Sequence, residues 1–164
     1  MKKVIILCFF FTLVASCMPA MRHYSGIKPI APKNSLLLPQ MTPVNVDSLQ
    51  PDFKWEAAVE DSTTFDFSIW KPNIEEVKAA SAYPESSISW GNEVYYVENL
   101  KDNFHKLERP LEYDTLYYWS VRKRRGSSVS DWSTFDETVI YTIGIATGRT
   151  SVSNTPFRFR TPAK

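Results

Sequence analysis

Cysteine is nearly absent from this sequence. The chain of 164 residues contains two cysteines, Cys8 and Cys17, and none after position 17. This distribution excludes disulfide bonds, thiolate metal sites and cysteine nucleophiles from the rest of the chain. A domain built from that remainder must be held together by packing alone, which a β-sandwich of roughly 120 residues can achieve.

Histidine and glycine are also scarce. The two histidines, His23 and His105, have no neighbours at a spacing typical of metal ligands. We expect His23 to be solvated and His105 to lie on a short exposed strand. The five glycines form no phosphate-binding loop, and the sequence has no nucleophile elbow. The sequence therefore predicts a protein that is not an enzyme and has no catalytic residues, metal or cofactor.

The chain has no excess of one charge. Its formal net charge is +1, and removing Lys2 and Lys3 from the 19 basic residues leaves 17 against 18 acidic residues. Such a balance provides no global field that attracts nucleic acid. We therefore expect no nucleic-acid partner.

Long hydrophobic runs are limited to the N-terminus. After Lys2 and Lys3, residues 4–14 form an uncharged run of eleven residues. This run suits the core of a signal peptide and is too short to span a bilayer. The residues that follow, Val14-Ala15-Ser16-Cys17, resemble the lipobox of bacterial lipoproteins.

The lipobox resemblance implies that residues 1–16 are a signal peptide and that Cys17 becomes the acylated first residue, with palmitate-type chains as its membrane anchor. Residue 18 is Met and not Asp, which by the same resemblance favours the outer membrane. The alternative is an ordinary signal peptide in which Cys17 is incidental.

Prolines recur after the proposed anchor, at positions 19, 29, 32 and 39. They break helices, and no periodic apolar pattern accompanies them. The sequence therefore predicts a lipid-anchored tether over residues 17–40 and a folded domain over residues 41–164.

Aromatic and β-branched residues are plentiful in residues 41–164, and they alternate with polar ones. The clearest case is 111–121, where Tyr117, Trp119 and Val121 recur at period two and predict a central strand. The same alternation predicts strands over residues 43–46, 53–59, 65–69, 93–100, 104–111 and 156–162. Asn73 and Glu76 indicate the start of a short helix between two of them.

Several of these residues resemble a fibronectin type III domain. Leu111, Thr115 and Tyr117 match the family's "tyrosine corner", in which the tyrosine hydroxyl bonds back to upstream backbone. The run Val129-Ser130-Asp131-Trp132-Ser133 resembles a turn of the bacterial members. The resemblance implies an all-β, immunoglobulin-like sandwich in which Tyr117, Trp119 and Trp55 are structural residues.

Residues 135–155 depart from the family pattern, because the family closes with its last strand soon after that turn. Val139, Tyr141, Ile143 and Ile145 alternate within this insert. They predict an extra strand or an extended hairpin that lies against the sheet edge.

Two groups of residues are candidates for binding. Arg122, Lys123, Arg124 and Arg125 form a basic run in an expected loop over residues 122–128, which is either an anion contact or a solvated hairpin. The aromatic candidates are Trp70, Tyr83 and Trp90, which fall outside the buried alternation and would provide a stacking platform for sugars.

Two functions fit these features. The first is a membrane-anchored envelope lipoprotein whose β-sandwich is a non-catalytic protein-interaction or structural module. It would bind the bilayer through acylated Cys17 and contact an envelope protein partner. The alternative is a carbohydrate-binding surface lipoprotein with a glycan as its ligand. We favour the first.

Overall fold

The computed structural model describes residues 21–33, 43–58, 62–73, 89–143 and 146–164. In these ranges the chain is all-β and contains no helix, which confirms the expected β class. The strands are β1 Met21–Ser25, β2 Lys28–Ala31, β3 Val44–Asn45, β4 Asp52–Glu56, β5 Thr63–Lys71, β6 Asn92–Leu100, β7 Phe104–Lys106, β8 Leu116–Arg125, β9 Ser128–Val129, β10 Thr134–Ile143, β11 Ala146–Thr155 and β12 Phe157–Arg160. The helix expected after Asn73 falls on residues 74–88, outside the described residues.

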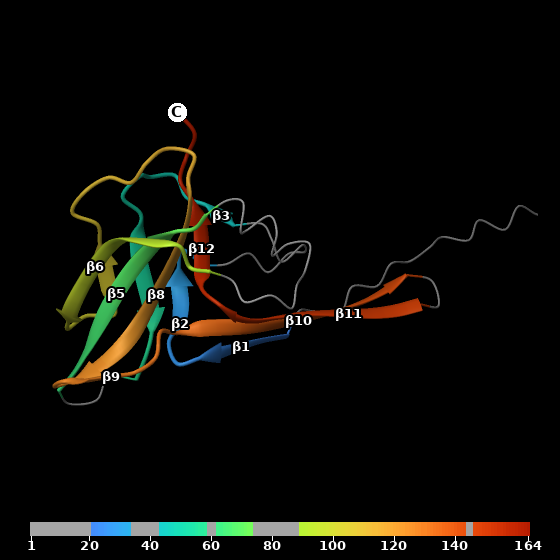
Figure 1. The fold of residues 1–164 in the computed structure, drawn as a ribbon, viewed down its shortest axis with the longest axis horizontal. Helices are drawn as coiled ribbons and strands as arrows, with labels where there is room; N and C mark the ends of the chain where they lie inside the picture. The colour runs from blue at the N-terminus through green and yellow to red at the C-terminus, as the bar shows by residue number, and fades with distance from the viewer. Residues whose placement is uncertain (1–20, 34–42, 59–61, 74–88, 144–145) are drawn as a thin grey trace, which may run out of the picture.

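Two sheets form the sandwich-like body of the molecule (Figure 1). The larger sheet has six strands in the order β3-β12-β8-β5-β6, with β9 attached to β8. The smaller sheet has the order β2-β4-β7. Strands β3 and β12 are parallel, whereas β12, β8, β5 and β6 are joined by antiparallel pairs.

The register between β5 and β8 sets the two faces of the larger sheet. Phe67 lies opposite Val121 and Ile69 lies opposite Trp119, and all four side chains are fully buried in the core. Successive strand residues point to opposite faces, so Asp66 and its even-numbered neighbours lie on the outer face. The predicted alternation is therefore confirmed for both strands.

The smaller sheet closes the core with two aromatic residues of β4. Phe53 and Trp55 are both buried. The Phe53 ring centroid lies 4.7 Å from that of Phe67 and 5.1 Å from that of Trp119, in tilted and edge-on contacts. Such geometries are the favoured ones for aromatic pairs. The core positions predicted for Trp55 and Trp119 are confirmed.

Tyr117 makes the backbone contact that the sequence predicted. Its side chain is buried, and its hydroxyl accepts a hydrogen bond from the backbone N–H of Glu112 at 3.2 Å. Thr161 fixes the same turn, because its hydroxyl donates to the carbonyl of Glu112 at 2.7 Å and accepts from the N–H of Thr115 at 2.9 Å. The start of β8 is therefore tied to the residue that follows β12.

Part of the expected tether belongs to the fold. Strand β1 pairs with β10, and β2 pairs with β4. Between them Ile27 is 1% exposed, and its N–H donates to Ser133 Oγ at 2.9 Å. The tether prediction was wrong for these residues, because their pairing partners lie far along the chain and the local proline content does not reveal them.

The insert at residues 135–155 forms the hairpin β10–β11. It lies in a separate sheet of order β1-β10-β11, which extends away from the sandwich (Figure 1). The expected position against the edge of the larger sheet was wrong, because β10 pairs with β1 in a sheet of its own. The base of the hairpin joins the core, where Phe135 stacks on Phe157 with a centroid distance of 6.2 Å.

Candidate functional site

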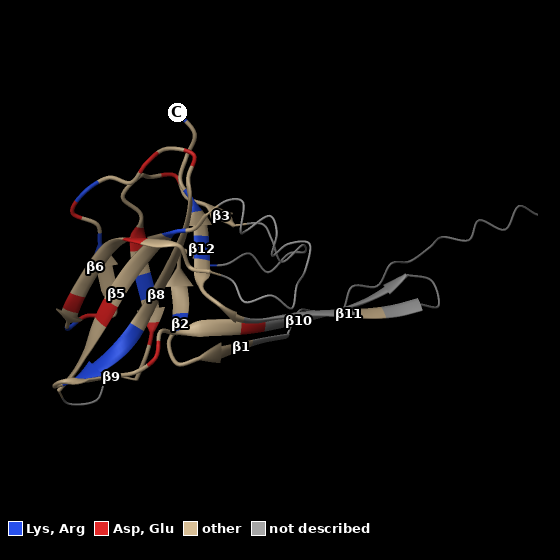
Figure 2. Cartoon of the chain, in the orientation of Figure 1, with Lys and Arg blue, Asp and Glu red and all other residues tan. Residues whose placement is uncertain are grey.

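The four basic residues at 122–125 end strand β8 and do not form a loop. Arg124 pairs with Val129 and Arg125 with Ser128, so the turn consists of Gly126 and Ser127 alone. Gly126 has φ +58°, a left-handed conformation that favours glycine. The expected loop was wrong because the strand pattern continues through charged residues. Figure 2 shows these basic residues at the end of β8 beside β9.

Two of the four basic residues bind a buried carboxylate within the chain. Asp66 is 0% exposed. One of its oxygens lies 2.9 Å from Arg122 Nε and 2.8 Å from Arg124 Nη2, and the other lies 2.7 Å from Arg124 Nε. Burial alone would raise the pKa of Asp66, but its hydrogen bonds to the two guanidinium groups outweigh burial and lower that pKa.

The same network reaches strand β6. Arg124 Nη2 lies 2.9 Å from Glu98 Oε2, and the Tyr96 hydroxyl donates to Asp66 Oδ2 at 3.3 Å. Arg122 and Arg124 are therefore engaged with internal acceptors. The other two predicted residues, Lys123 and Arg125, lie at the end of the same strand, where Arg125 is exposed, and they stay predicted contacts for an external anion.

An aromatic row continues from Arg122 across the outer face of the larger sheet. The Arg122 guanidinium lies 4.5 Å from the ring centroid of Trp132. Trp132 meets Trp70 edge-on at 5.0 Å, and Trp70 meets Trp90 edge-on at 4.7 Å. The structure therefore joins the basic and the aromatic candidates in one continuous row.

The row differs from the expected sugar platform. Trp70 is 8% exposed, because Trp90 and Trp132 pack against it. Stacking on a sugar needs an exposed ring face, so Trp70 does not serve as a stacking residue. Trp90 is half-buried, and Tyr83 lies outside the described residues.

Trp132 was not identified as a site residue from the sequence. The turn that holds it is fixed by serines: Ser133 N–H donates to the carbonyl of Val121 at 3.0 Å, and Ser120 Oγ donates to the carbonyl of Ser133 at 2.6 Å. Arg122 follows Ser120 by two residues and therefore lies on the same outer face of the sheet. This position was the signal in the sequence that an aromatic side chain would cover Arg122.

A polar surface pocket of about 410 Å³ lies beside the aromatic row. Its lining residues are Lys71, Pro72, Asn73, Ser89, Gly91 and Asn92. Among the described lining residues there is no carboxylate or histidine, and hence no acid–base pair. Lys71 is held by Glu112 at 2.6 Å, and this hydrogen bond raises the pKa of Lys71.

The two histidines lie apart from this face. His23 is exposed, as expected. The exposed position expected for His105 was wrong, because its ring is half-buried, 5.1 Å from that of Phe67, with Nε2 2.9 Å from the Tyr95 hydroxyl. This burial lowers the pKa of His105. Within the described ranges, no three potential ligands form a metal site.

Comparison with protein families, with curated proteins and with solved structures finds no match. In the part of the chain that the structure describes, no helix is long and apolar enough to cross a membrane.

Proposed function

We propose that the chain is an envelope lipoprotein, acylated at Cys17 and carried to the outer membrane. Its sandwich would be a fibronectin type III-like module with a non-catalytic interaction or structural role. The run Val14-Ala15-Ser16-Cys17 supports the anchor. The hydrogen bond from Glu112 N–H to the Tyr117 hydroxyl supports the finer fold assignment, because it is the contact of a tyrosine corner.

The observation that carries the interaction role is the long outer strand of the larger sheet. Strand β6 has nine residues and stands last in the strand order. Among the described strands, β5 is its one pairing partner. Tyr96 in this strand is 41% exposed. An open edge of this kind presents backbone donors and acceptors to which a strand of another protein can add.

Lys123 and Arg125 would contribute charge to the same contact. Both lie in the last residues of β8, and Arg125 is exposed. Their positive charge favours a partner with an acidic segment, through attraction that weakens as salt rises. The glycan alternative is supported less well, because the aromatic rings of Trp70, Trp90 and Trp132 are occupied by one another.

Site-specific photo-crosslinking in intact cells tests this proposal. A crosslinking residue at Tyr96 or Arg125 should yield a protein adduct of defined mass. The matched control is Tyr113, which is 48% exposed and lies in the turn before β8. Equal adducts at all three positions, or none at Tyr96 and Arg125, would contradict the proposed edge contact.

A glycan array with the purified protein tests the alternative. Specific binding of one glycan class that is lost in Trp90→Ala would replace the protein-interaction proposal with the carbohydrate-binding one. We expect no selective binding.

A further inference from the structure

The outer half of the β10–β11 ribbon differs in composition from the rest of the domain. Residues 138–148 contain no charged residue and are bounded by Glu137 and Arg149. In the described residues, strand β1 pairs with β10 as far as Thr138, which lies opposite Met21, the first described residue. Beyond that point the described ribbon has two strands, and the uncharged residues occupy this two-stranded part.

The backbone register places apolar residues on both faces of this part. Ile140 pairs with Arg149, Tyr141 with Gly148 and Ile143 with Ala146. Because strand residues alternate at period two, Tyr141 and Ile143 share one face while Ile140 lies on the other. A two-stranded ribbon has no layer of its own against which to bury such residues, and an isolated one is marginally stable in water.

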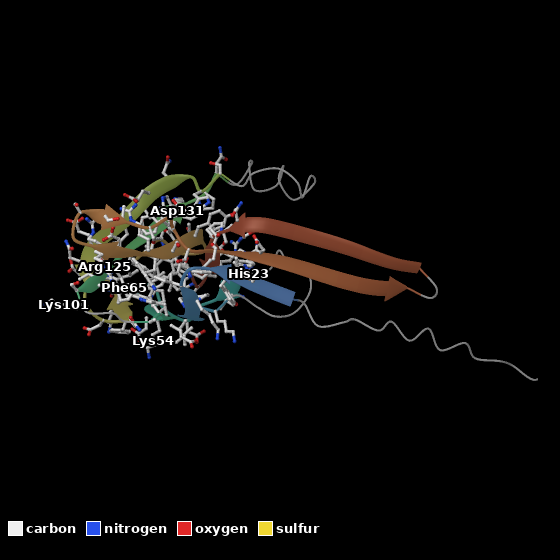
Figure 3. The ribbon with its side chains drawn as sticks, turned by 90° about the horizontal axis from the view of Figure 1, so that it is seen from below. His23, Lys54, Phe65, Lys101, Arg125 and Asp131 are labelled. Atoms are coloured by element: carbon white, nitrogen blue, oxygen red, sulfur yellow. The ribbon has the colours of Figure 1, made fainter. Side chains whose placement is uncertain are left out.

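The base of the ribbon is fixed to the sandwich. Ser25 Oγ and Thr134 Oγ1 lie 2.7 Å apart, and the Tyr24 ring lies 6.4 Å from that of Phe135. These contacts anchor β1 and β10 to the core that Phe135 shares with Phe157. The base of the ribbon is therefore held against the sandwich, and the rest of the ribbon extends away from it, as Figure 3 shows.

The position of Cys17 indicates what the ribbon contacts. Met21 pairs with Thr138 and Ser25 with Thr134, so β1 runs toward the sandwich and the chain enters it from the outer half of the ribbon. Met21 lies four positions after Cys17, and this stretch spans at most about 14 Å when extended. The six residues from Thr138 to Ile143 extend about 17 Å between the first and last Cα atoms. An acyl anchor at Cys17 therefore lies within reach of the uncharged part.

We propose that residues 138–143 and 146–149 of the ribbon lie in the interfacial layer of the bilayer that holds the acyl chains of Cys17. This inference rests on the proposed lipid anchor. The ribbon and the anchor together form two membrane contacts, which orient the sandwich with β6 accessible from the aqueous side.

The unpaired backbone groups at the edges of the ribbon limit how deeply it can enter the bilayer. Unpaired strand edges are not tolerated in the hydrocarbon region, because their backbone groups have no partner there. The ribbon therefore stays at headgroup level, where these groups remain hydrated. Tyr141 and Arg149 suit that level, since aromatic residues gather at the membrane interface and basic residues are attracted to anionic headgroups.

The absence of cysteine after position 17 permits a direct test. The full-length acylated protein, as Thr142→Cys, is labelled with an environment-sensitive fluorophore in vesicles of phosphatidylethanolamine and phosphatidylglycerol that contain spin-labelled lipid. The matched control is Lys101→Cys, which is exposed and lies at the end of the body opposite the ribbon (Figure 3). We expect a blue shift and strong lipid quenching at Thr142, and neither at Lys101.

A second variant separates membrane contact from other causes. Ile140→Asp with Ile143→Asp, in the Thr142→Cys background, should abolish the quenching and leave thermal unfolding of the sandwich unchanged. A label at Thr142 that behaves like the one at Lys101 would overturn the inference. So would a blue shift without lipid quenching, which would indicate contact with protein. Fatty-acid incorporation is measured separately: its absence refutes the anchor, whereas an acylated chain with an unquenched ribbon refutes this inference alone.

Discussion

Replacing Asp66 by asparagine removes a negative charge from the outer face of the larger sheet and keeps the size of the side chain. Asp66 is fully buried and bonds two guanidinium groups at 2.7 to 2.9 Å. Removing one partner of a buried ion pair costs about 3–5 kcal/mol, because the remaining charge stays poorly hydrated. The side chains of Arg122 and Arg124 are 22% and 17% exposed. Since part of their hydration can return, we expect a loss of about 3 kcal/mol.

Equilibrium unfolding in urea measures this loss. With a slope of about 1–3 kcal/mol/M, a loss of about 3 kcal/mol moves the midpoint down by about 1–3 M. Glu98→Gln is the matched control, because it removes an exposed carboxylate from the same Arg124 and should leave the midpoint unchanged. Equal midpoints for Asp66→Asn and the unmodified protein would refute the expectation that the ion pairs of Asp66 with Arg122 and Arg124 stabilise the domain.

Three further predictions use the same assay. Tyr117→Phe leaves the Glu112 N–H without its acceptor and should cost about 1 kcal/mol; an unchanged midpoint would count against the corner. Trp55→Ala, at a fully buried position, should cost about 3–5 kcal/mol, whereas Tyr113→Ala at an exposed turn should cost little. Burial lowers the pKa of His105 in the folded state, so the unfolded chain binds a proton first as the pH falls below about 6.5. Stability should therefore fall with acidification, and His105→Phe should reduce that fall; identical pH profiles would refute this.

The strands of the core could be predicted from the sequence because their signal is local. Alternation at period two identified β5 and β8, and the resemblance to fibronectin type III domains around Tyr117 implied its backbone bond. The partners of outer-face residues could not be predicted in the same way. Asp66 and Arg124 are 58 positions apart, and only the antiparallel pairing of β5 with β8 brings them together.

Strands β1 and β2 could not be predicted from the sequence for a related reason. Strand β1 is short and gains its place by pairing with β10, more than a hundred residues later. Local composition near Pro29 and Pro32 favours an irregular segment, and tertiary pairing overrides that preference. For the insert at residues 135–155, the hairpin could be predicted from the alternation of its own residues. The pairing of this hairpin with β1 could not.

The chemical state of Cys17 tests the proposed function most directly. Intact-mass and peptide mass spectrometry of the mature protein, purified from its own membranes, determines the first residue and any acyl group on it. We expect a chain that begins at Cys17 and carries diacylglycerol on sulfur, with label from a fatty-acid probe that is lost in Cys17→Ser. A mature chain that begins elsewhere, or that retains a free thiol at Cys17, would contradict it.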